Sequence, residues 1–380
     1  TNFFFEIEEA EGLKQYGKSK EHRPNPIVQM GLFLDGNGIP LAFDLTPGNT
    51  NEQKTLLPLE KRIMRDFALS KLVVCTDAGL SSKTNRSFNS FANRAYVTVQ
   101  SLKKLKQHLR DWALDPQAWH LNGSSTVFNL NEIDLEDNTA VYTKERWIHE
   151  NGLEERLIIS FSPKYKRYQE TIRGRQIERA CHQIEVKAPA RSAKNPNDPA
   201  RFIQELKTTP SGEVAQQRHL SLDLDKIDNE RQYDGFYGVV TNLEDDVQTI
   251  LRINQRRWEI EESFRIMKSE FKARPVYLQN EKRIEAHFLT CFMALTLFRI
   301  LEKRLNETIS AETLIQTLRE MDLHPIRAQG YIPLFKRTAL TDKLQRIFGY
   351  QLSTEIVDMD TMKKNKRISK QKKLLQSEHI

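Results

Sequence analysis

The sequence predicts an α/β fold, in which a mixed sheet with flanking helices is interrupted by a β-rich insertion. Three observations support this class. Residues 28–49 read as a strand, a turn and a second strand, and residues 71–79 form a short β-branched run typical of a buried parallel strand. Residues 253–271 repeat their apolar positions with helical spacing. Strands and helices therefore alternate along one chain, which is the order of an α/β protein.

The first block of elements covers residues 1–104. Its hairpin is expected to turn at Asp35–Gly38 and to be followed by a helix. The buried strand ends at Asp77, and a polar helix from Ser82 and a strand over 95–100 complete the block. Three antiparallel strands, a helix and a buried parallel strand make the ribonuclease-H-like fold one candidate.

The sequence pattern changes over residues 105–232. A hairpin over 140–162 has Asn151–Gly152 at its tip, where both residues favour the backbone conformation of a tight turn. A charged helix is expected over 165–185, before a connection rich in Pro, Ala and Asn over 187–202. This block is predicted to be the β-rich insertion.

The chain after the insertion divides into two parts. Residues 233–305 are expected to complete the core with a buried strand and a long helix, and residues 306–380 to form a C-terminal helical region. The tail Lys363–Lys373 carries no acid, and the whole chain has a net charge of +7. A basic balance favours a polyanion partner, most simply nucleic acid, and a solvated tail is the alternative.

Composition excludes several classes of protein. With 380 residues, 38% of them hydrophobic, the chain can form a globular body. Its longest apolar stretch, 286–301, is interrupted by Arg299, so a buried core helix with His287 as a core histidine is predicted. The three cysteines are far apart and lack a C-x-x-C motif, which indicates a reducing compartment. No H-x-x-x-H pair is present, and zinc is not expected.

Residues 12–19, GLKQYGKS, match the phosphate-loop pattern G-x-x-x-x-G-K-[ST]. A phosphate loop needs a helix directly after it, so that the helix N-terminus faces the phosphates. Pro24 and Pro26 follow Ser19 closely, and proline interrupts an ordinary helix. The match is therefore predicted to be accidental, and no nucleotide cofactor is expected.

The predicted helix over 253–271 carries charged side chains on a stripe beside its apolar face. With Arg257 at zero and about 100° per residue, Lys268, Glu261, Asn254 and Arg265 fall between about 20° and 80°. The neighbouring arc is apolar and consists of Ile253, Ile260, Phe264, Met267 and Phe271, whereas Glu259, Glu262 and Glu270 lie on the far side. A simple alternative is i,i+4 pairing of Arg257 with Glu261 on a solvated face.

Asp77 is a second carboxylate with no packing reason for its position. It follows a buried strand, at the end where α/β sheets bind ligands. Two carboxylates from distant positions suit Mg²⁺, and a pair of such ions about 3.5–4 Å apart can activate water and stabilise a leaving oxygen. Arg257 and Lys268 would then hold neighbouring phosphates.

The spacing R-x₃-E-x₆-K of Arg257, Glu261 and Lys268 resembles the signature of the insertion-sequence-four family of DDE transposases. Residues 73–80, VVCTDAGL, resemble its second-Asp motif, and residues 16–56 resemble the segment after its first Asp. The resemblance spans nearly Thr1 to Leu301.

It implies a ribonuclease-H-like core with a β-rich insertion, and metal-dependent DNA cleavage and strand transfer. Asp77 and Glu261 would bind Mg²⁺ or Mn²⁺, two ions in the complete enzyme, while Arg257, Lys268 and Arg265 would contact phosphates. The implied partners are double-stranded DNA of the transposon ends and target and a second protomer on DNA. The implied location is the cytoplasm, on the nucleoid when DNA is bound.

Two departures from the family pattern stand out. The signature tyrosine is Asn254 here, and the first Asp of a D-x-T motif would lie two residues before Thr1. Asp35 and Asp44 are expected to be turn and strand-end residues rather than substitutes. The chain is therefore expected to be a fragment that lacks one metal-binding carboxylate and the N-terminal DNA-recognition region, folds, and binds DNA weakly.

Two other functions were weighed against the transposase. One is a catalytically dead remnant that only binds DNA. The other is a glycosidase that uses Asp77 and Glu261 as its carboxylate pair, which the flanking cations and the four tryptophans disfavour.

Four further residues have two interpretations each. Trp147 could stack on an extruded base or be a cross-strand aromatic in a small sheet, and the second is favoured. Lys18, Lys20 and Arg23 could contact DNA phosphates or belong to a solvated loop.

Overall fold

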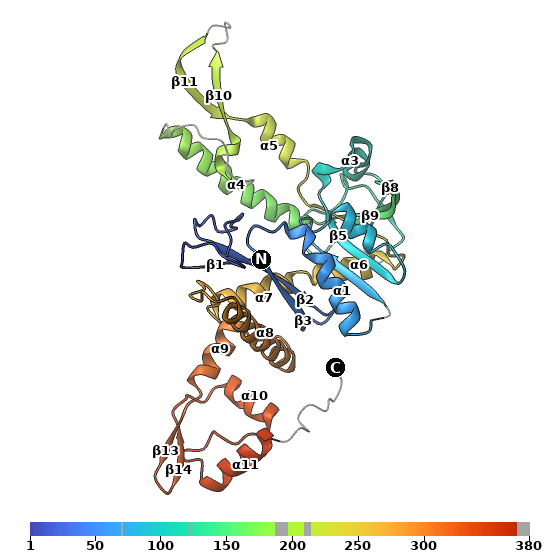
Figure 1. The fold of residues 1–380 in the computed structure, drawn as a ribbon. Helices are drawn as coiled ribbons and strands as arrows, with labels where there is room; N and C mark the ends of the chain where they lie inside the picture. The colour runs from blue at the N-terminus through green and yellow to red at the C-terminus, as the bar shows by residue number, and fades with distance from the viewer. Residues whose placement is uncertain (70, 122–123, 187–196, 209–213, 371–380) are drawn as a thin grey trace. The chain divides into compact units, whose positions relative to one another are not determined.

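The computed structural model describes residues 1–69, 71–121, 124–186, 197–208 and 214–370. It divides into two compact units (Figure 1). The first unit joins Thr1–Asp66 to Trp258–Ile380, and the second is Phe67–Arg257. The chain passes from one unit to the other after Asp66 and again after Arg257.

The first unit contains an antiparallel sheet in the order β1 (Asn2–Phe4), β2 (Ile27–Leu34) and β3 (Pro40–Pro47). Asp35 fixes the turn between β2 and β3, because its Oδ1 accepts the N–H groups of Asn37 and Ile39, each at 2.8 Å. The predicted hairpin and the turn role of Asp35 are thereby confirmed.

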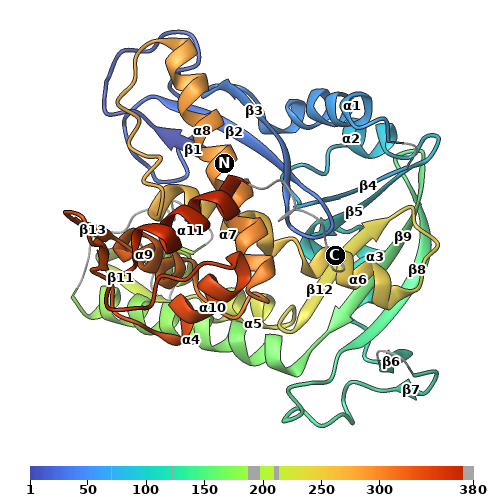
Figure 2. The ribbon, with the colours of Figure 1, turned by 90° about the horizontal axis from the view of Figure 1, so that it is seen from below.

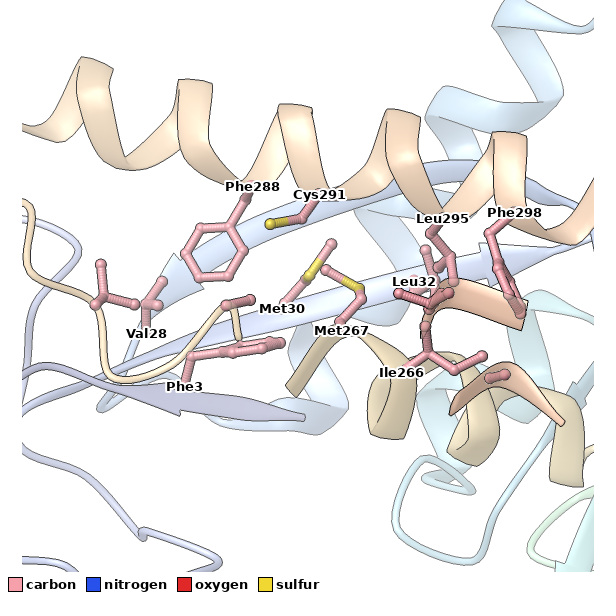
Figure 3. Packing of buried hydrophobic residues seen from close by; sticks show 14 of the residues in the cluster. Phe3, Val28, Met30, Leu32, Ile266, Met267, Phe288, Cys291, Leu295 and Phe298 are labelled. Atoms are coloured by element: carbon pink, nitrogen blue, oxygen red, sulfur yellow. The ribbon is translucent and has the colours of Figure 1, made fainter. Parts of the chain in front are cut away.

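Helices cover this sheet and extend the first unit toward the C-terminus. The apolar face of α8 (Glu281–Arg304) packs against the sheet. Figure 3 shows Met267 of α7 (Trp258–Ser269) next to Met30 of β2, and Leu32 of β2 between Ile266 and Leu295. The elements are η1 (Glu52–Lys54), α1 (Leu56–Asp66), α7 (Trp258–Ser269), α8 (Glu281–Arg304), α9 (Ala311–Glu320), β13 (Leu323–Ile326), β14 (Gly330–Pro333), α10 (Ala339–Phe348) and α11 (Met359–Lys370).

The second unit is built on a seven-stranded mixed sheet, whose first five strands lie side by side in Figure 2. Only the first pair of strands, β4 (Leu72–Thr76) and β5 (Arg94–Gln100), is parallel. The β-branched run over residues 71–79 predicted such a buried parallel strand. The order is β4 (Leu72–Thr76), β5 (Arg94–Gln100), β12 (Phe236–Thr241), β9 (Leu153–Phe161), β8 (Tyr142–Glu150), β6 (Trp119–Leu121) and β7 (Val127–Phe128). The hairpin expected in the insertion thus shares one sheet with the strands expected in the core.

Successive residues of the central strands face opposite sides of this sheet. Val240 and Ile159 belong to the hydrophobic core that includes residues of α3 (Gln107–Leu114). Val239 and Ile158 belong to the hydrophobic core on the other face, which includes residues of α6 (Val247–Gln255). Both faces are therefore buried, which explains the continuous apolar runs. The other elements are α2 (Lys83–Phe88), η2 (Leu102–Lys104), α3 (Gln107–Leu114), α4 (Pro163–Glu185), η3 (Pro199–Phe202), β10 (Ile203–Thr208), β11 (Val214–Leu222), α5 (Leu224–Arg231) and α6 (Val247–Gln255).

The long helix predicted through residues 253–271 is wrong in one respect, because it is two helices. It breaks after Gln255, where the N–H of Arg257 bonds to the carbonyl of Asn254 at 3.1 Å and tightens the last turn. Angles measured from Arg257 on one helical wheel therefore do not apply to the residues of α7. Glu259, placed on the far side by the wheel, is only 7% exposed.

The predicted domain boundaries, after residues 104, 232 and 305, differ from the points at which the compact units change. They stay a prediction about domain organisation. The Pro/Ala/Asn-rich connection over 187–196 and the tail end 371–373 lie outside the described residues.

Among the described residues, α8 has the length and hydropathy of a membrane-crossing helix, although about a third of its most apolar window is buried inside the protein. Its inward side chains, such as Phe288 and Leu295, are fully buried in the core of the first unit (Figure 3). This packing agrees with the predicted core helix. His287 on the same helix is half-buried, and its Nε2 lies 3.3 Å from the carbonyl of Ala273.

Candidate functional site

Asp77 lies directly after β4 and is exposed. Its Oδ1 accepts the backbone N–H groups of Gly79 at 2.9 Å and Leu80 at 3.2 Å. No hydrogen bond to Oδ2 occurs among the described residues. The turn therefore fixes the carboxylate while one oxygen stays open to solvent, and a hard carboxylate oxygen of this kind fits a divalent cation such as Mg²⁺.

Two buried threonines fix the strand end that carries Asp77. Thr76 donates its hydroxyl to Thr98 at 3.0 Å, and Thr98 donates to the backbone carbonyl of Asp77 at 3.2 Å. These bonds join β4 to β5 at the last residue pair of their ladder, Thr76 and Thr98. Asp77 is thus held by side chains as well as by the turn that follows it.

Arg257 belongs to the same unit as Asp77. Burial raises the pKa of the Cys75 thiol to about 11, and the positive charge of Arg257 partly opposes this rise. The guanidinium therefore acts electrostatically on a residue two positions before Asp77. The Cys75 thiol stays protonated at neutral pH and is not an activated nucleophile.

Glu261 lies in the first turn of α7 and is exposed. A carboxylate at this position is stabilised by the positive end of the helix dipole. Glu259, two residues earlier, is buried beside Gly38 of the β2–β3 turn, where an added Cβ would collide with its carboxylate. Gly38 also has a φ of +77°, which glycine adopts without strain.

A buried arginine fixes the start of α7. Arg299 of α8 is 4% exposed and donates to the carbonyl of Glu259 and the hydroxyl of Ser263, both at 2.9 Å. It also bonds Glu302 at 2.6 Å. Since Glu261 lies between the two clamped residues, this network sets the position of its backbone. Sequence reasoning noted Arg299 only as an interruption of an apolar run, although a charge there is the signal of a buried polar network.

Lys268 is largely buried at the other end of α7, with 14% of its side chain exposed. Its Nζ donates to the hydroxyl of Thr1 at 2.9 Å and lies 3.9 Å from a carboxylate oxygen of Glu21. Burial lowers the pKa of Lys268, and the charge of Lys20 lowers it further. The structure therefore brings two of the predicted phosphate-binding lysines, Lys20 and Lys268, within electrostatic reach of each other.

Three of the remaining predicted cations have partners of their own, and the fourth, Lys18, is exposed. Arg265 forms a two-bond pair with Glu262, at 2.6 and 2.8 Å, which lowers the pKa of that carboxyl. Lys20 lies 3.2 Å from Glu52, and Arg23 lies over the ring of Phe4 at 4.3 Å. Lys18 lies in the loop that matched the phosphate-loop pattern.

No helix follows that loop within residues 19–26, as the two prolines predicted. Gly17 instead lies against the backbone of Gly48, where any Cβ would collide with its carbonyl oxygen. The glycine of the pattern is explained by this close approach of two loops.

Trp147 lies on β8 and pairs with Arg156 across the hairpin. It is 46% exposed and lines a groove of about 1110 Å³ in the second unit. Phe91, 69% exposed, and Arg146 line the same groove. Trp147 is thus a cross-strand aromatic, and its ring still has a free face.

Among the described residues, no group of three or more His, Cys, Asp or Glu side chains forms a metal cluster. Asp77 belongs to the second unit and Glu261 to the first. Each half of the predicted site is built on its own unit.

The family model described as a transposase DDE domain matches residues 3–297. The chain belongs to this family. No curated protein matches the chain. DDE transposases act in DNA transposition, cleave and transfer DNA strands, and generally use divalent metals. The family match favours neither the glycosidase nor the DNA-binding remnant. In this transposase the match ends within α8, so α9, α10 and α11 lie beyond it.

Proposed function

We propose that this DDE transposase domain catalyses metal-dependent cleavage at transposon ends and transfer of the freed 3′ end to target DNA. The observation that carries the proposal is the carboxylate of Asp77, fixed at the end of a parallel strand with one oxygen free of hydrogen bonds among the described residues. In an α/β sheet this is the edge where ligands bind.

Asp77 and Glu261 are proposed as metal ligands. Two ions of Mg²⁺ or Mn²⁺ would supply charge stabilisation and an activated oxygen nucleophile. The core is proposed to be ribonuclease-H-like with a β-rich insertion, as in the insertion-sequence-four family.

The phosphates are proposed to contact Arg257 and Lys268. Lys268 suits this role because burial disfavours its charge, and a phosphate would give the ammonium a closer anionic partner than Glu21, which lies 3.9 Å away. Arg265 would have to leave Glu262 first. Lys18, Lys20 and Arg23 are proposed as secondary contacts.

The partner is proposed to be double-stranded DNA, both transposon ends and target, bound by two protomers in the cytoplasm. Trp147 is proposed to stack on a base that leaves the duplex during cleavage. Its exposed ring and the neighbouring Phe91 provide the flat apolar surface that an unpaired base requires.

The test is cleavage of transposon-end DNA by the protein, with Glu261→Gln compared with Glu262→Gln. Both changes remove one carboxylate charge from α7, but only Glu261 is proposed to bind metal. We expect Glu261→Gln to slow cleavage by about 10²–10³-fold or more, and Glu262→Gln to slow it far less.

A second readout does not depend on turnover. Iron(II) bound in place of Mg²⁺ is oxidised to iron(III) by added hydrogen peroxide, which is reduced to hydroxide and a hydroxyl radical that cuts the nearby backbone, so fragments ending near residues 77 and 261 are expected. Loss of the cut near residue 77 in Asp77→Asn, and of the cut near residue 261 in Glu261→Gln, supports the assignment of each residue as a metal ligand. If Asp77→Asn and Glu261→Gln leave both the radical cutting of the protein and the cleavage of DNA unchanged, the metal-ligand assignment is wrong.

A further inference from the structure

The last described helix, α11, has a solvent face made of cations. Met359–Lys370 contains five of them, and they lie beyond the part of the chain that matches the transposase domain. The five are Lys363, Lys364, Lys366, Arg367 and Lys370, and all are exposed. At about 100° per residue they occupy one arc of about 160°.

The opposite face of α11 is anchored, so the cations keep a fixed direction. Met362 and Asn365 are 8% and 6% exposed. The amide of Asn365 accepts the N–H of Gln351 at 3.2 Å and donates to its carbonyl at 3.0 Å. Just before the helix, Val357 pairs with Tyr331 of β14 through two backbone hydrogen bonds of 2.8 and 2.9 Å. Figure 1 shows α11 beside β14 and α10.

The charge on this face is almost unopposed. Asp360 lies 2.9 Å from Lys363, in the first turn. For the other four cations, no carboxylate within ion-pair distance occurs in the described part of the chain. Cations three or four positions apart, such as Lys366 and Lys370 or Lys364 and Arg367, repel each other and cost the isolated helix a few tenths of a kcal/mol per pair.

An ordinary solvated face mixes both signs, as α7 does with its Arg265–Glu262 pair. A face of one sign is stabilised only when an anionic surface neutralises it. Duplex DNA fits best, because it presents closely spaced phosphates along the roughly 18 Å that twelve helical residues span.

Two other polyanions fit less well. Single-stranded nucleic acid is held by aromatic rings as well as charge, and α11 has no aromatic residue. An anionic membrane surface requires several exposed apolar side chains beside the cations, whereas in α11 Met362 is buried, Ile368 is partly buried and only Met359 is exposed.

We propose that the basic face of α11 binds the phosphate backbone of duplex DNA without regard to base sequence. The inference rests on the proposed function, since the DNA is that of the transposition reaction. It concerns affinity and not chemistry, so α11 would raise the local concentration of DNA while Asp77 and Glu261 act on it.

The experiment measures binding of the full chain to a fluorescein-labelled duplex of mixed sequence by anisotropy over a range of salt concentrations. The variant replaces Lys364, Lys366, Arg367 and Lys370 by Gln. We expect the slope of log K against log salt to become shallower by about 3 to 4, which is the loss of four phosphate contacts. Since like-charge repulsion is relieved, the thermal midpoint should not fall.

The matched control removes the same charge from four separate elements by replacing Lys54, Lys104, Lys164 and Lys282, all exposed, with Gln. Its slope is expected to change by much less. A second variant, Lys364→Arg with Lys366→Arg and Lys370→Arg, should bind as the original chain does. Equal loss in the α11 variant and the matched control overturns the inference, because net charge alone then explains binding.

Two further outcomes are informative. Stronger binding to an RNA duplex or to anionic vesicles than to the DNA duplex also overturns it. Failure of the proposed function has a different signature, in which Glu261→Gln leaves cleavage unchanged while the α11 slope effect persists.

Discussion

At the scale of single residues, Lys144 shows how burial sets a charge. Its side chain is 5% exposed, and its Nζ lies 4.6 Å from the centre of the Trp119 ring and donates to the carbonyl of Asp115 at 2.7 Å. Burial nevertheless lowers the pKa of Lys144 to about 8, and the Asp115 charge only partly opposes it. The two contacts hold the ammonium in place without restoring its hydration.

This shift makes stability depend on pH. Between pH 8 and 10.5 the unfolded chain keeps the proton that folded Lys144 gives up, so stability should rise with pH across that window. We expect the free energy of unfolding to rise by about 1–3 kcal/mol relative to Lys144→Met, which has no such group. Urea unfolding of both proteins at several pH values measures the difference. A difference that stays flat would show that Lys144 titrates normally.

Trp147 gives a second prediction at this scale. If its exposed face stacks on a base, Trp147→Ala should weaken binding to a duplex that contains an unpaired base by about 1–3 kcal/mol. Trp147→Phe should retain most of the affinity, because a ring remains. Anisotropy with paired and unpaired duplexes measures both. Equal weakening on the fully paired duplex would point to a structural role for Trp147 in the β8–β9 hairpin.

At the scale of elements, Arg299 joins α8 to the first turn of α7. Arg299→Met should lower the free energy of unfolding by about 3–5 kcal/mol, because Glu302 would lose its partner while still largely buried. Arg283→Met, an exposed position on the same helix, should change it by less than about 0.5 kcal/mol. Urea denaturation followed by circular dichroism compares the two. Similar small losses in both would mean that the network does not hold α7.

The elements that sequence predicted best are those whose cause is local. Asp35 fixes the β2–β3 turn within four residues, and Asn151 and Gly152 both adopt the positive φ, +56° and +77°, of the predicted hairpin tip. The cap of α2 by Ser82 is of the same kind, since its hydroxyl accepts the N–H of Asn85 at 3.2 Å. The position of Asp77 after β4 follows from such a local signal.

Features that depend on distant contacts were missed. The wheel over 253–271 assumed one continuous helix, but the chain changes unit at Arg257, so the phase restarts in α7. The side chain of Glu259 therefore points into the protein beside Gly38, and its carbonyl accepts a hydrogen bond from Arg299. Both partners are distant in the sequence, so a local sequence pattern could not predict these contacts. The environment of Lys268 is likewise set by Thr1, which lies 267 positions earlier in the chain.

At the scale of the whole molecule, each unit has a core of its own. The core of the first unit joins strands from its N-terminal part to α7 and α8, so it closes only when residues more than 200 positions apart meet. The second unit is continuous in sequence, and its sheet is assembled from strands between Leu72 and Thr241. The first core is therefore expected to form later in folding than the second.

Independent cores predict that one unit can be destabilised without the other. Phe288 is fully buried and meets Phe3 edge to face at 4.9 Å, so Phe288→Ala should cost the first unit about 3–5 kcal/mol. Trp112, Trp119 and Trp147 all belong to the second unit, and tryptophan fluorescence therefore reports mainly on that unit.

In Phe288→Ala, the unfolding midpoint seen by circular dichroism should fall, and that seen by fluorescence should stay close to the original. Ile159→Ala, in the core of the second unit, should lower the fluorescence midpoint instead. If Phe288→Ala moves both midpoints equally, the two units unfold as one cooperative body. Separate midpoints would instead mean that each unit has its own stability, so that Asp77 and Glu261 are carried on bodies that unfold separately.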